Sequence, residues 1–117
     1  LAIAGTDIKE GVMSGTEFIV EDGVCKLKDR SAFAGSIATA DRLVRVMTKE
    51  CGYDILTAVK MITETPAKIA KINAGSIEKG KRADIIVFDD DINVEATFIV
   101  GQKIDSIQIQ EIKKWKN

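Results

Sequence analysis

The first third of the chain places its apolar residues in short runs rather than at helical spacing. Residues 1–16 are rich in glycine and lack a regular period, which predicts an irregular loop. Two apolar runs then flank the pair Asp22-Gly23, which accepts positive φ angles at little cost. The pattern predicts a β-hairpin over residues 17–28, followed by a short connection over residues 31–35.

The middle of the chain changes to a helical period. Ser36 is a residue type that can cap a helix through its hydroxyl oxygen, and Gly52 is a typical helix stop. The apolar residues between them recur three or four positions apart, as one face of a helix requires. They are Ile37, Ala40, Val44 and Met47. We therefore predict a helix that begins at Ser36 and ends at Gly52.

Two further helices are predicted after Gly52. Asp54 suits the positive end of a helix, and Ile55, Val59 and Ile62 would share one face of it. Pro66 is tolerated at a first helical position, whereas it disfavours helical geometry at the preceding Thr65. The third helix is therefore predicted over residues 67–72.

Beyond residue 75 the pattern predicts strands. Residues 83–88 are apolar enough to be covered on both faces, so Ile86 is predicted to be buried. A second strand is predicted over residues 95–100, and Gly101-Gln102 resembles a tight turn into a third strand over residues 103–109. A hairpin, two to three helices and then antiparallel strands together make an α+β chain.

Composition narrows the possible partners. The 17 basic and 18 acidic residues give a net charge of -1, so nothing attracts nucleic acid or an anionic membrane electrostatically. No apolar run approaches the roughly 20 residues that span a bilayer, and the apolar start lacks the basic flank of a signal peptide. Cys25 and Cys51 are predicted to be buried free thiols in a reducing cytoplasm. The basic tail, residues 111–117, is predicted to be a solvated end.

Two motifs imitate ligand sites. Residues 75–82 match a phosphate-binding loop except at Arg82, where a hydroxyl should hold magnesium, and they run from helix to strand instead of strand to helix. Residues 89–91 are three aspartates without the glycine and closing glutamate of a calcium loop. We interpret both segments as solvated turns. The small residues 31–36 could offer free backbone N–H groups to a polar ligand, although an ordinary capped connection is the simpler interpretation.

Catalytic chemistry is largely missing. The chain contains no histidine, so neither a Cys-His nucleophile nor a histidine-containing zinc site can be built within it. No catalytic residue and no metal ligand is predicted in this chain.

A series of motifs nevertheless resembles the closing segment of amidohydrolase-superfamily enzymes. The residues that carry this resemblance are Thr65-Pro66-Ala67-Lys68, Gly75-Ser76-Ile77, Gly80-Lys81 and Ala83 to Val87. Together with Ala34-Gly35-Ser36, Asp89 to Thr97 and Val100-Gly101-Gln102, they resemble the C-terminal third of the N-acetylglucosamine-6-phosphate deacetylase family.

This resemblance implies a metal-dependent (β/α)8 barrel with a small β-sandwich, and a cytoplasmic enzyme of amino sugar metabolism. Residues 1–72 would end the barrel domain, and residues 73–117 would supply sandwich strands and the tail. The parent enzyme would use a divalent metal, zinc or iron, to act on a sugar-phosphate substrate. This chain would not bind the metal. Phe33, Ala34 and Gly35 match the loop that touches the substrate.

The family's catalytic aspartate would lie about two positions upstream of Leu1. The pair Thr6-Asp7 imitates its motif but would shorten the span to Gly35, so we reject it. We therefore expect a C-terminal fragment that is inactive alone and self-associates, as a homo-oligomer or through exposed strand edges. Two alternatives stay open. One is a non-enzymatic, partner-binding module, and the other is a fragment of another amidohydrolase, such as a dihydroorotase-like or deaminase-like enzyme.

Overall fold

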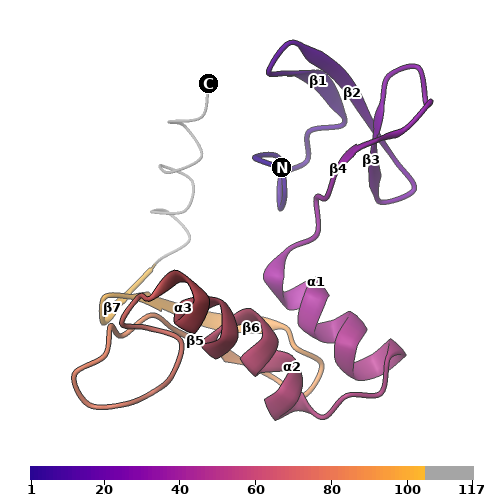
Figure 1. The fold of residues 1–117 in the computed structure, drawn as a ribbon. Coiled ribbons are helices and arrows are strands. Elements are labelled where there is room, and N and C mark those ends of the chain that lie inside the picture. The colour runs from indigo at the N-terminus through magenta and orange to yellow at the C-terminus, as the bar shows by residue number, and fades with distance from the viewer. Residues whose placement is uncertain (105–117) are drawn as a thin grey trace. The chain divides into compact units, whose positions relative to one another are not determined.

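The computed structural model describes residues 1–104 and divides the chain into two compact units (Figure 1). The first unit is Leu1–Leu43, and the second begins at Val44. Each unit has its own apolar core. Strands, then helices, then antiparallel strands follow one another along the chain, which confirms a small α+β piece.

The first unit is a four-stranded antiparallel meander with strand order β1-β2-β3-β4. Its strands are β1 (Glu10–Met13), β2 (Thr16–Glu21), β3 (Val24–Leu27) and β4 (Phe33–Gly35). The predicted hairpin over residues 17–28 is confirmed as β2 and β3. Two other predictions are wrong, because β1 lies in the expected loop and β4 in the expected connection. Both strands exist through pairing with a neighbouring strand, which a local residue pattern does not reveal.

Two tight turns close the hairpins of this meander. Asp22 and Gly23 have φ angles of 53° and 73°, and Ser14 and Gly15 have φ angles of 51° and 80°. Two consecutive positive φ angles match the right-handed twist of the flanking strands, which is why such turns dominate two-residue hairpins. The Asp22-Gly23 turn was predicted, whereas the Ser14-Gly15 turn was not.

The core of the first unit consists of Ile3, Phe18 and Cys25, and the Cys25 side chain is fully buried. Phe18 and Val20 reach this core from the same face of β2, as alternation along a strand requires. Cys51 is exposed, so the prediction that both thiols are buried is wrong for Cys51. It follows the end of the π-helical turn, and no element of residues 1–104 covers it.

The first helix begins four residues later than predicted. Helix α1 is Ala40–Arg45, and it continues as one π-helical turn, Val46–Glu50. Ser36 is therefore not its cap: the Ser36 hydroxyl oxygen accepts a hydrogen bond from the Ala38 amide (3.2 Å). Ile37 packs against the core of the first unit, and this contact keeps the segment before Ala40 out of the helix. Gly52 follows the helical region with φ 76°, as predicted.

Helices α2 (Ile55–Ile62) and α3 (Glu64–Ala70) follow. Asp54 caps α2, because its carboxylate accepts a hydrogen bond from the Thr57 amide (3.0 Å). Helix α3 begins three residues before its predicted start at residue 67. Pro66 lies in its first turn, where a missing N–H removes no helical hydrogen bond, and Thr65 is helical despite the proline that follows it.

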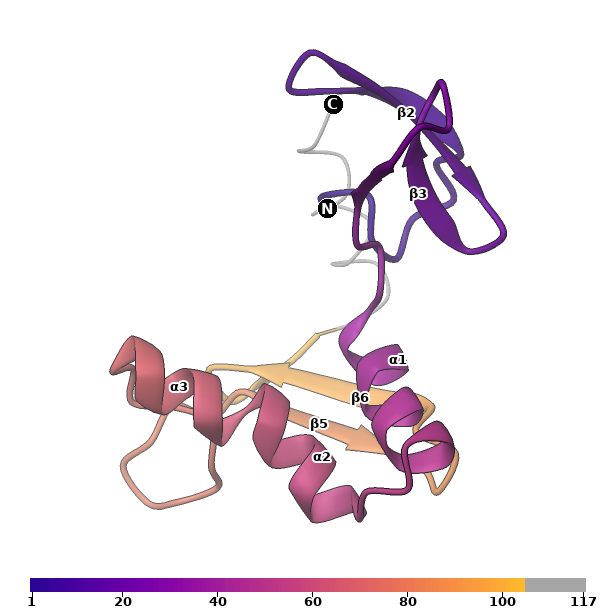
Figure 2. The same ribbon diagram turned by 45° about the vertical axis from the view of Figure 1, so that its right-hand side comes forward.

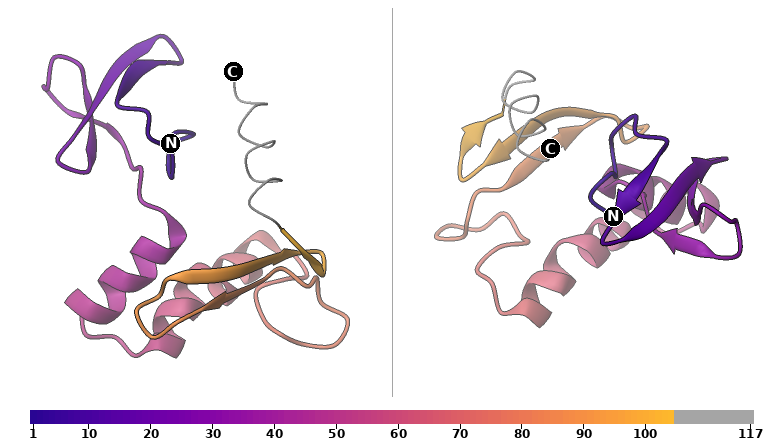
Figure 3. Two further views of the ribbon diagram at one scale, coloured as in Figure 1. Left: turned by 180° about the vertical axis from the view of Figure 1, so that it is seen from behind. Right: turned by 90° about the horizontal axis from the view of Figure 1, so that it is seen from above.

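The second unit also contains a three-stranded antiparallel sheet of order β5-β6-β7. The strands are β5 (Ile85–Phe88), β6 (Val94–Ile99) and β7 (Gln102–Lys103). Helices α2 and α3 run along one face of β5 and β6, as Figure 2 and the views in Figure 3 show. Val44, Ala58 and Ile92 form the core, with Phe88 packed against it.

Three details of this sheet differ from the predictions. Ile86 is 44% exposed in the described structure, so its predicted burial is wrong, because the helices cover only one face of β5. The turn after β6 is Val100-Gly101, where both φ angles are positive, instead of Gly101-Gln102. Residues 105–109 of the predicted third strand, and the tail at 111–117, lie outside the described residues.

The unit boundary after Leu43 differs in position from the expected domain boundary after residue 72. The expected boundary concerns the domains of a longer enzyme, so it stays a prediction. None of the described helices is long and apolar enough to cross a membrane.

Candidate functional site

The three residues predicted to contact substrate make up the short edge strand β4. Phe33 is 74% exposed, so its ring is presented to solvent. Ala34 packs against the core of the first unit, and Gly35 is half-buried. The strand therefore holds its backbone against the core while it offers one aromatic face outward.

Pairing with β3 fixes this strand. Gly35 lies opposite Cys25 and Phe33 lies opposite Lys26, with an irregularity in register between the two pairs. The Leu27 amide also donates a hydrogen bond to the Ala32 carbonyl oxygen (2.9 Å), just before β4 begins. Because Cys25 is fully buried, the end of β4 at Gly35 is anchored to the least accessible part of the unit.

The loop from β3 to β4 is held by two carboxylates. Arg30 donates to both carboxylate oxygens of Glu21, from Nη2 at 2.7 Å and from Nε at 3.0 Å. Asp29 accepts hydrogen bonds from the Ser31 amide (2.9 Å) and the Ser31 hydroxyl (2.7 Å). The Arg30 hydrogen bond lowers the pKa of Glu21, and the hydrogen bond from the Ser31 backbone lowers the pKa of Asp29. These exposed contacts orient the loop that leads into Phe33.

Gly35 is where β4 meets the start of the chain. Its φ angle is 144°, and a Cβ atom added there would lie 2.9 Å from Cδ2 of Leu1. The nitrogen of Leu1 also donates to the Ser36 carbonyl oxygen (2.6 Å). A side chain at position 35 would therefore push Leu1 away from the strand.

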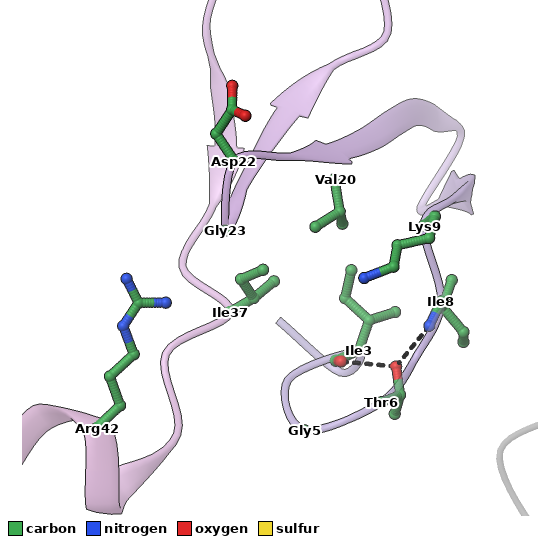
Figure 4. Close-up of a pocket in the computed structure, with 10 residues that line it drawn as sticks. All are labelled: Ile3, Gly5, Thr6, Ile8, Lys9, Val20, Asp22, Gly23, Ile37 and Arg42. Atoms are coloured by element: carbon green, nitrogen blue, oxygen red, sulfur yellow. Dashed lines mark hydrogen bonds between the residues drawn. The ribbon is translucent and has the colours of Figure 1, made fainter.

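A pocket of about 280 Å³ lies within the first unit (Figure 4). It is formed by the segment before β1, the β2–β3 turn and the segment that enters α1. The residues that line it are Ile3, Gly5, Thr6, Ile8, Lys9, Val20, Asp22, Gly23, Ile37 and Arg42. None of them was predicted as a site residue. No sequence signal could have found the pocket, because its walls come from three separate segments.

Thr6-Asp7, the pair that imitates the family's catalytic motif, lies in a local turn, and Thr6 lines this pocket. The Thr6 hydroxyl donates to the Ile3 carbonyl oxygen (2.7 Å) and accepts from the Ile8 amide (3.4 Å). Asp7 is exposed. The rejection of Asp7 as the catalytic aspartate stays a prediction.

The two motifs that imitate ligand sites are turns. The Lys81 amine donates to the Ser76 hydroxyl and to the Glu78 carboxylate (2.9 Å), which closes the glycine-flanked loop on itself. Asp89 accepts from the Asn93 amide (2.8 Å) and from the Asn93 side chain (2.9 Å) between β5 and β6. The Asp89 carboxylate thus stabilises the turn that joins two strands.

Residues 1–104 do not fit a catalytic divalent metal. The sequence has no histidine, and residues 1–104 contain no group of three or more Asp, Glu or Cys side chains that could hold an ion. What β4 presents to a ligand is the exposed ring of Phe33.

Comparison with known proteins places these features in context. The model of the amidohydrolase family matches residues 4–110. The chain is 31% identical to an N-acetylglucosamine-6-phosphate deacetylase of Caenorhabditis elegans over 107 residues, which are 88% of this chain and 26% of that protein. It is 34% identical to an N-acetylgalactosamine-6-phosphate deacetylase of Shewanella sp. over 72% of this chain and 22% of that protein.

A third relative is an enzyme with a different activity. An adenine deaminase of Ligilactobacillus salivarius is 39% identical, but over only 55% of this chain and 11% of its own length. Among solved structures, the N-acetylglucosamine-6-phosphate deacetylase of Pasteurella multocida superposes with a TM-score of 0.81 at 30% identity, over 88% of this chain and 27% of that one. The chain thus spans about a quarter of the length of the deacetylases it matches, and the resemblance seen in its motifs is confirmed.

Proposed function

Because the chain belongs to the amidohydrolase family, we propose that it is the C-terminal part of a longer amidohydrolase. That enzyme hydrolyses the amide bond of N-acetylglucosamine 6-phosphate and releases acetate and glucosamine 6-phosphate. One deacetylase relative and one solved deacetylase structure each match 88% of this chain, and they support this assignment. Two adenine deaminases match 55% and 80% of this chain, which is less than that relative does, and only 11% and 16% of their own length.

The observation that carries the proposal is the presentation of β4. Phe33 is exposed at the edge of the sheet, while Ala34 and Gly35 are fixed behind it by the core and by Cys25. An exposed aromatic ring on a strand that is paired and packed behind it suits a sugar, whose C–H faces pack on apolar surface. Phe33, Ala34 and Gly35 therefore contact the substrate in the proposed enzyme.

The contact between Leu1 and Gly35 links this strand to the proposed catalytic base. The aspartate that takes a proton from the attacking water and returns it to the leaving amine is proposed to lie about two positions before Leu1. Since Leu1 packs directly on Gly35, a residue just before Leu1 would lie near β4. The enzyme's divalent metal is proposed to be held by residues outside this chain, because residues 1–104 contain no group of three or more side chains that could hold an ion. Its phosphate-binding groups are proposed to lie outside this chain as well.

In the proposed enzyme, residues 1–72 complete a (β/α)8 barrel and residues 73–117 contribute to a small β-sandwich. The two units then have different roles in the enzyme. This chain contacts substrate through β4, and its second unit supplies packing surface, because large apolar side chains there, such as Leu56 and Ile69, are exposed.

The test begins with the coding sequence upstream of Leu1. An in-frame extension should encode a histidine-bearing segment and an aspartate just before Leu1. The encoded protein should release acetate from N-acetylglucosamine 6-phosphate faster than from N-acetylgalactosamine 6-phosphate, and should release no ammonia from adenine. A start codon at Leu1, or deamination of adenine, would overturn the proposal.

Substitutions at Phe33 test its role in that enzyme. Phe33→Ala should lower kcat/KM by about tenfold, whereas Phe33→Leu should retain most of the activity because it keeps an apolar side chain. Ile77→Ala is the matched control, since Ile77 is 85% exposed and lies in the other unit. Equal activities of Phe33→Ala and the control would remove Phe33 from the site.

A non-enzymatic module that binds a partner through its strand edges is the other candidate. Strand β5 lies at one edge of its sheet, and Ile86 and Val87 on it are each 44% exposed. Expression of the chain by itself from a start codon at Leu1, together with capture of a strand-forming peptide at β5, would favour this module.

A further inference from the structure

The pocket of the first unit contains two cationic side chains that the proposed function does not use. We propose that this pocket binds a small molecule with two anionic groups, a dicarboxylate or a phosphorylated carboxylic acid, with Lys9 and Arg42 as the donors. The site is separate from Phe33, Ala34 and Gly35, none of which lines the pocket. The inference therefore does not rest on the proposed deacetylase activity.

The pairing of the basic residues in this unit singles out these two. Lys26, Lys28 and Arg30 each form an ion pair with a carboxylate of the meander. In contrast, the side chains of Lys9 and Arg42 make no hydrogen bond or ion pair within residues 1–104. Both therefore keep their full donor capacity for a ligand, and Arg42 has the planar fork that suits a carboxylate or phosphate.

The position of the two cations indicates a ligand with charge at both ends. Figure 4 shows the Lys9 amine directed toward Ile3 and Val20, with Arg42 on the opposite side of Ile37. Apolar side chains thus lie between the two charges. A molecule with a short carbon chain between two anionic groups would match this arrangement of a cation, apolar side chains and a second cation. The pocket volume of about 280 Å³ suits a small metabolite.

The shape of the pocket depends on two glycines. Gly5 and Gly23 both line it and both have positive φ angles, 72° and 73°. A Cβ atom at Gly23 would lie 3.6 Å from Nη1 of Arg42, which is an ordinary contact distance, so the guanidinium lies against the β2–β3 turn. The buried Ile3 and the half-buried Val20 and Ile37 keep water away from one side of the pocket. Partial exclusion of water strengthens the attraction between a cation and an anion.

Asp22 is the one carboxylate among the residues that line this pocket. Its side chain is 90% exposed and lies 3.9 Å from the Lys26 amine. Figure 4 shows its carboxylate pointing away from Ile3. Two cations against this single acid leave the pocket with a surplus positive charge, which favours an anionic ligand.

The experiment is an NMR titration of the 117-residue chain with succinate, at constant ionic strength, with acetate as the single-ended comparison. Succinate should shift the amide signals of Gly5, Thr6 and Gly23 in a saturating manner. It should bind at least about tenfold more tightly than acetate, because its second carboxylate binds as an intramolecular partner. A parallel titration with 3-phosphoglycerate shows whether a phosphate is preferred to the second carboxylate.

Variants assign the binding to the two cations. Lys9→Gln and Arg42→Gln should each weaken succinate binding by about fivefold or more and bring it close to that of acetate. Lys79→Gln removes an exposed lysine from the other unit and should change nothing. Equal binding of succinate and acetate, shifts that do not saturate, or affinities that are unchanged in Lys9→Gln and Arg42→Gln would each overturn the proposal.

Discussion

Leu1 packs directly on Gly35, so closely that a Cβ atom at position 35 would lie 2.9 Å from Cδ2 of Leu1. The two residues are joined again through Ser36, whose carbonyl oxygen accepts a hydrogen bond from the nitrogen of Leu1 (2.6 Å). The segment before β1 and the strand proposed to contact substrate are therefore one packed structure. A change at either residue should affect both.

Replacing Gly35 with alanine tests this contact. The variant should lower the free energy of unfolding by about 3 kcal/mol, because it combines an unfavourable positive φ with a steric overlap. Gly15→Ala should cost only about 1–2 kcal/mol, since its φ is also positive (80°) but nothing lies within 4 Å of its added Cβ. The measurement is urea unfolding followed by circular dichroism. Leu1→Ala in the Gly35→Ala background should recover about 1 kcal/mol, and no recovery would show that overlap with Leu1 is not the cause.

The core of the second unit gives a second prediction. Val44 is 3% exposed and packs with Ala58 and Ile92. Val44→Ala should lower the free energy of unfolding by about 1–3 kcal/mol, because it removes buried apolar atoms and leaves a cavity. Leu56→Ala, at a side chain that is 71% exposed, should change it by less than about 0.5 kcal/mol. Equal effects of the two substitutions in urea unfolding would contradict the assigned core.

The stability of the second unit should also depend on pH through Asp89. Hydrogen bonds from Asn93, first from its side chain and then from its backbone, lower the pKa of Asp89 below its ordinary value of 3.8. A carboxyl group with a lowered folded-state pKa stabilises the fold fully above its unfolded pKa. That stabilisation is lost as the pH falls through the folded-state pKa.

Asp89→Asn should therefore lower the melting temperature near neutral pH and flatten its decline in acid below about pH 4. Asp90→Asn is the control, because only the backbone oxygen of Asp90 takes part in a described hydrogen bond, from Lys49. Melting curves from about pH 2 to pH 7 make the comparison. An acid dependence of Asp89→Asn as steep as that of the unsubstituted chain would remove Asp89 as a source of it.

Self-association is the fourth prediction. Strand β5 lies at the edge of its sheet in the described structure, and Ile86 on it is 44% exposed. An unpaired edge that carries apolar side chains tends to pair with another chain. Ile86→Lys should reduce association, measured by light scattering across concentrations, with little change in the melting temperature. Ile77→Lys introduces the same charge in a loop and should leave association unchanged, and a monomer at all concentrations would contradict the prediction.

Local signals in the sequence predicted the structure correctly where a residue sets its own backbone conformation or hydrogen-bonds to backbone a few positions away. Asp22-Gly23 predicted the β2–β3 turn because the pair tolerates the positive φ angles that the turn needs. Asp54 marked the start of α2 because its carboxylate bonds an amide three residues on. The start of α3 was predicted too late from Pro66. A proline can occupy any position of the first turn, because the N–H groups there have no partner within the helix.

Features that depend on distant partners could not be predicted. Strand β4 exists because Gly35 pairs with Cys25, and the helix expected from Ser36 begins at Ala40 because Ile37 packs on the core of the first unit. The covered and open faces of β5 follow from the position of α2 and α3 and not from the composition of the strand.

By itself the sequence determined the α+β class, the order of the main elements, the missing histidine chemistry and the resemblance to amidohydrolases, since each is written in short-range pattern or in composition. Only the tertiary structure decided that Leu1 lies on Gly35, that Phe33 is presented at a sheet edge, and that Lys9 and Arg42 share a pocket. Such juxtapositions join residues far apart in the chain. The free energy of packing and pairing settles them, and no local pattern encodes it.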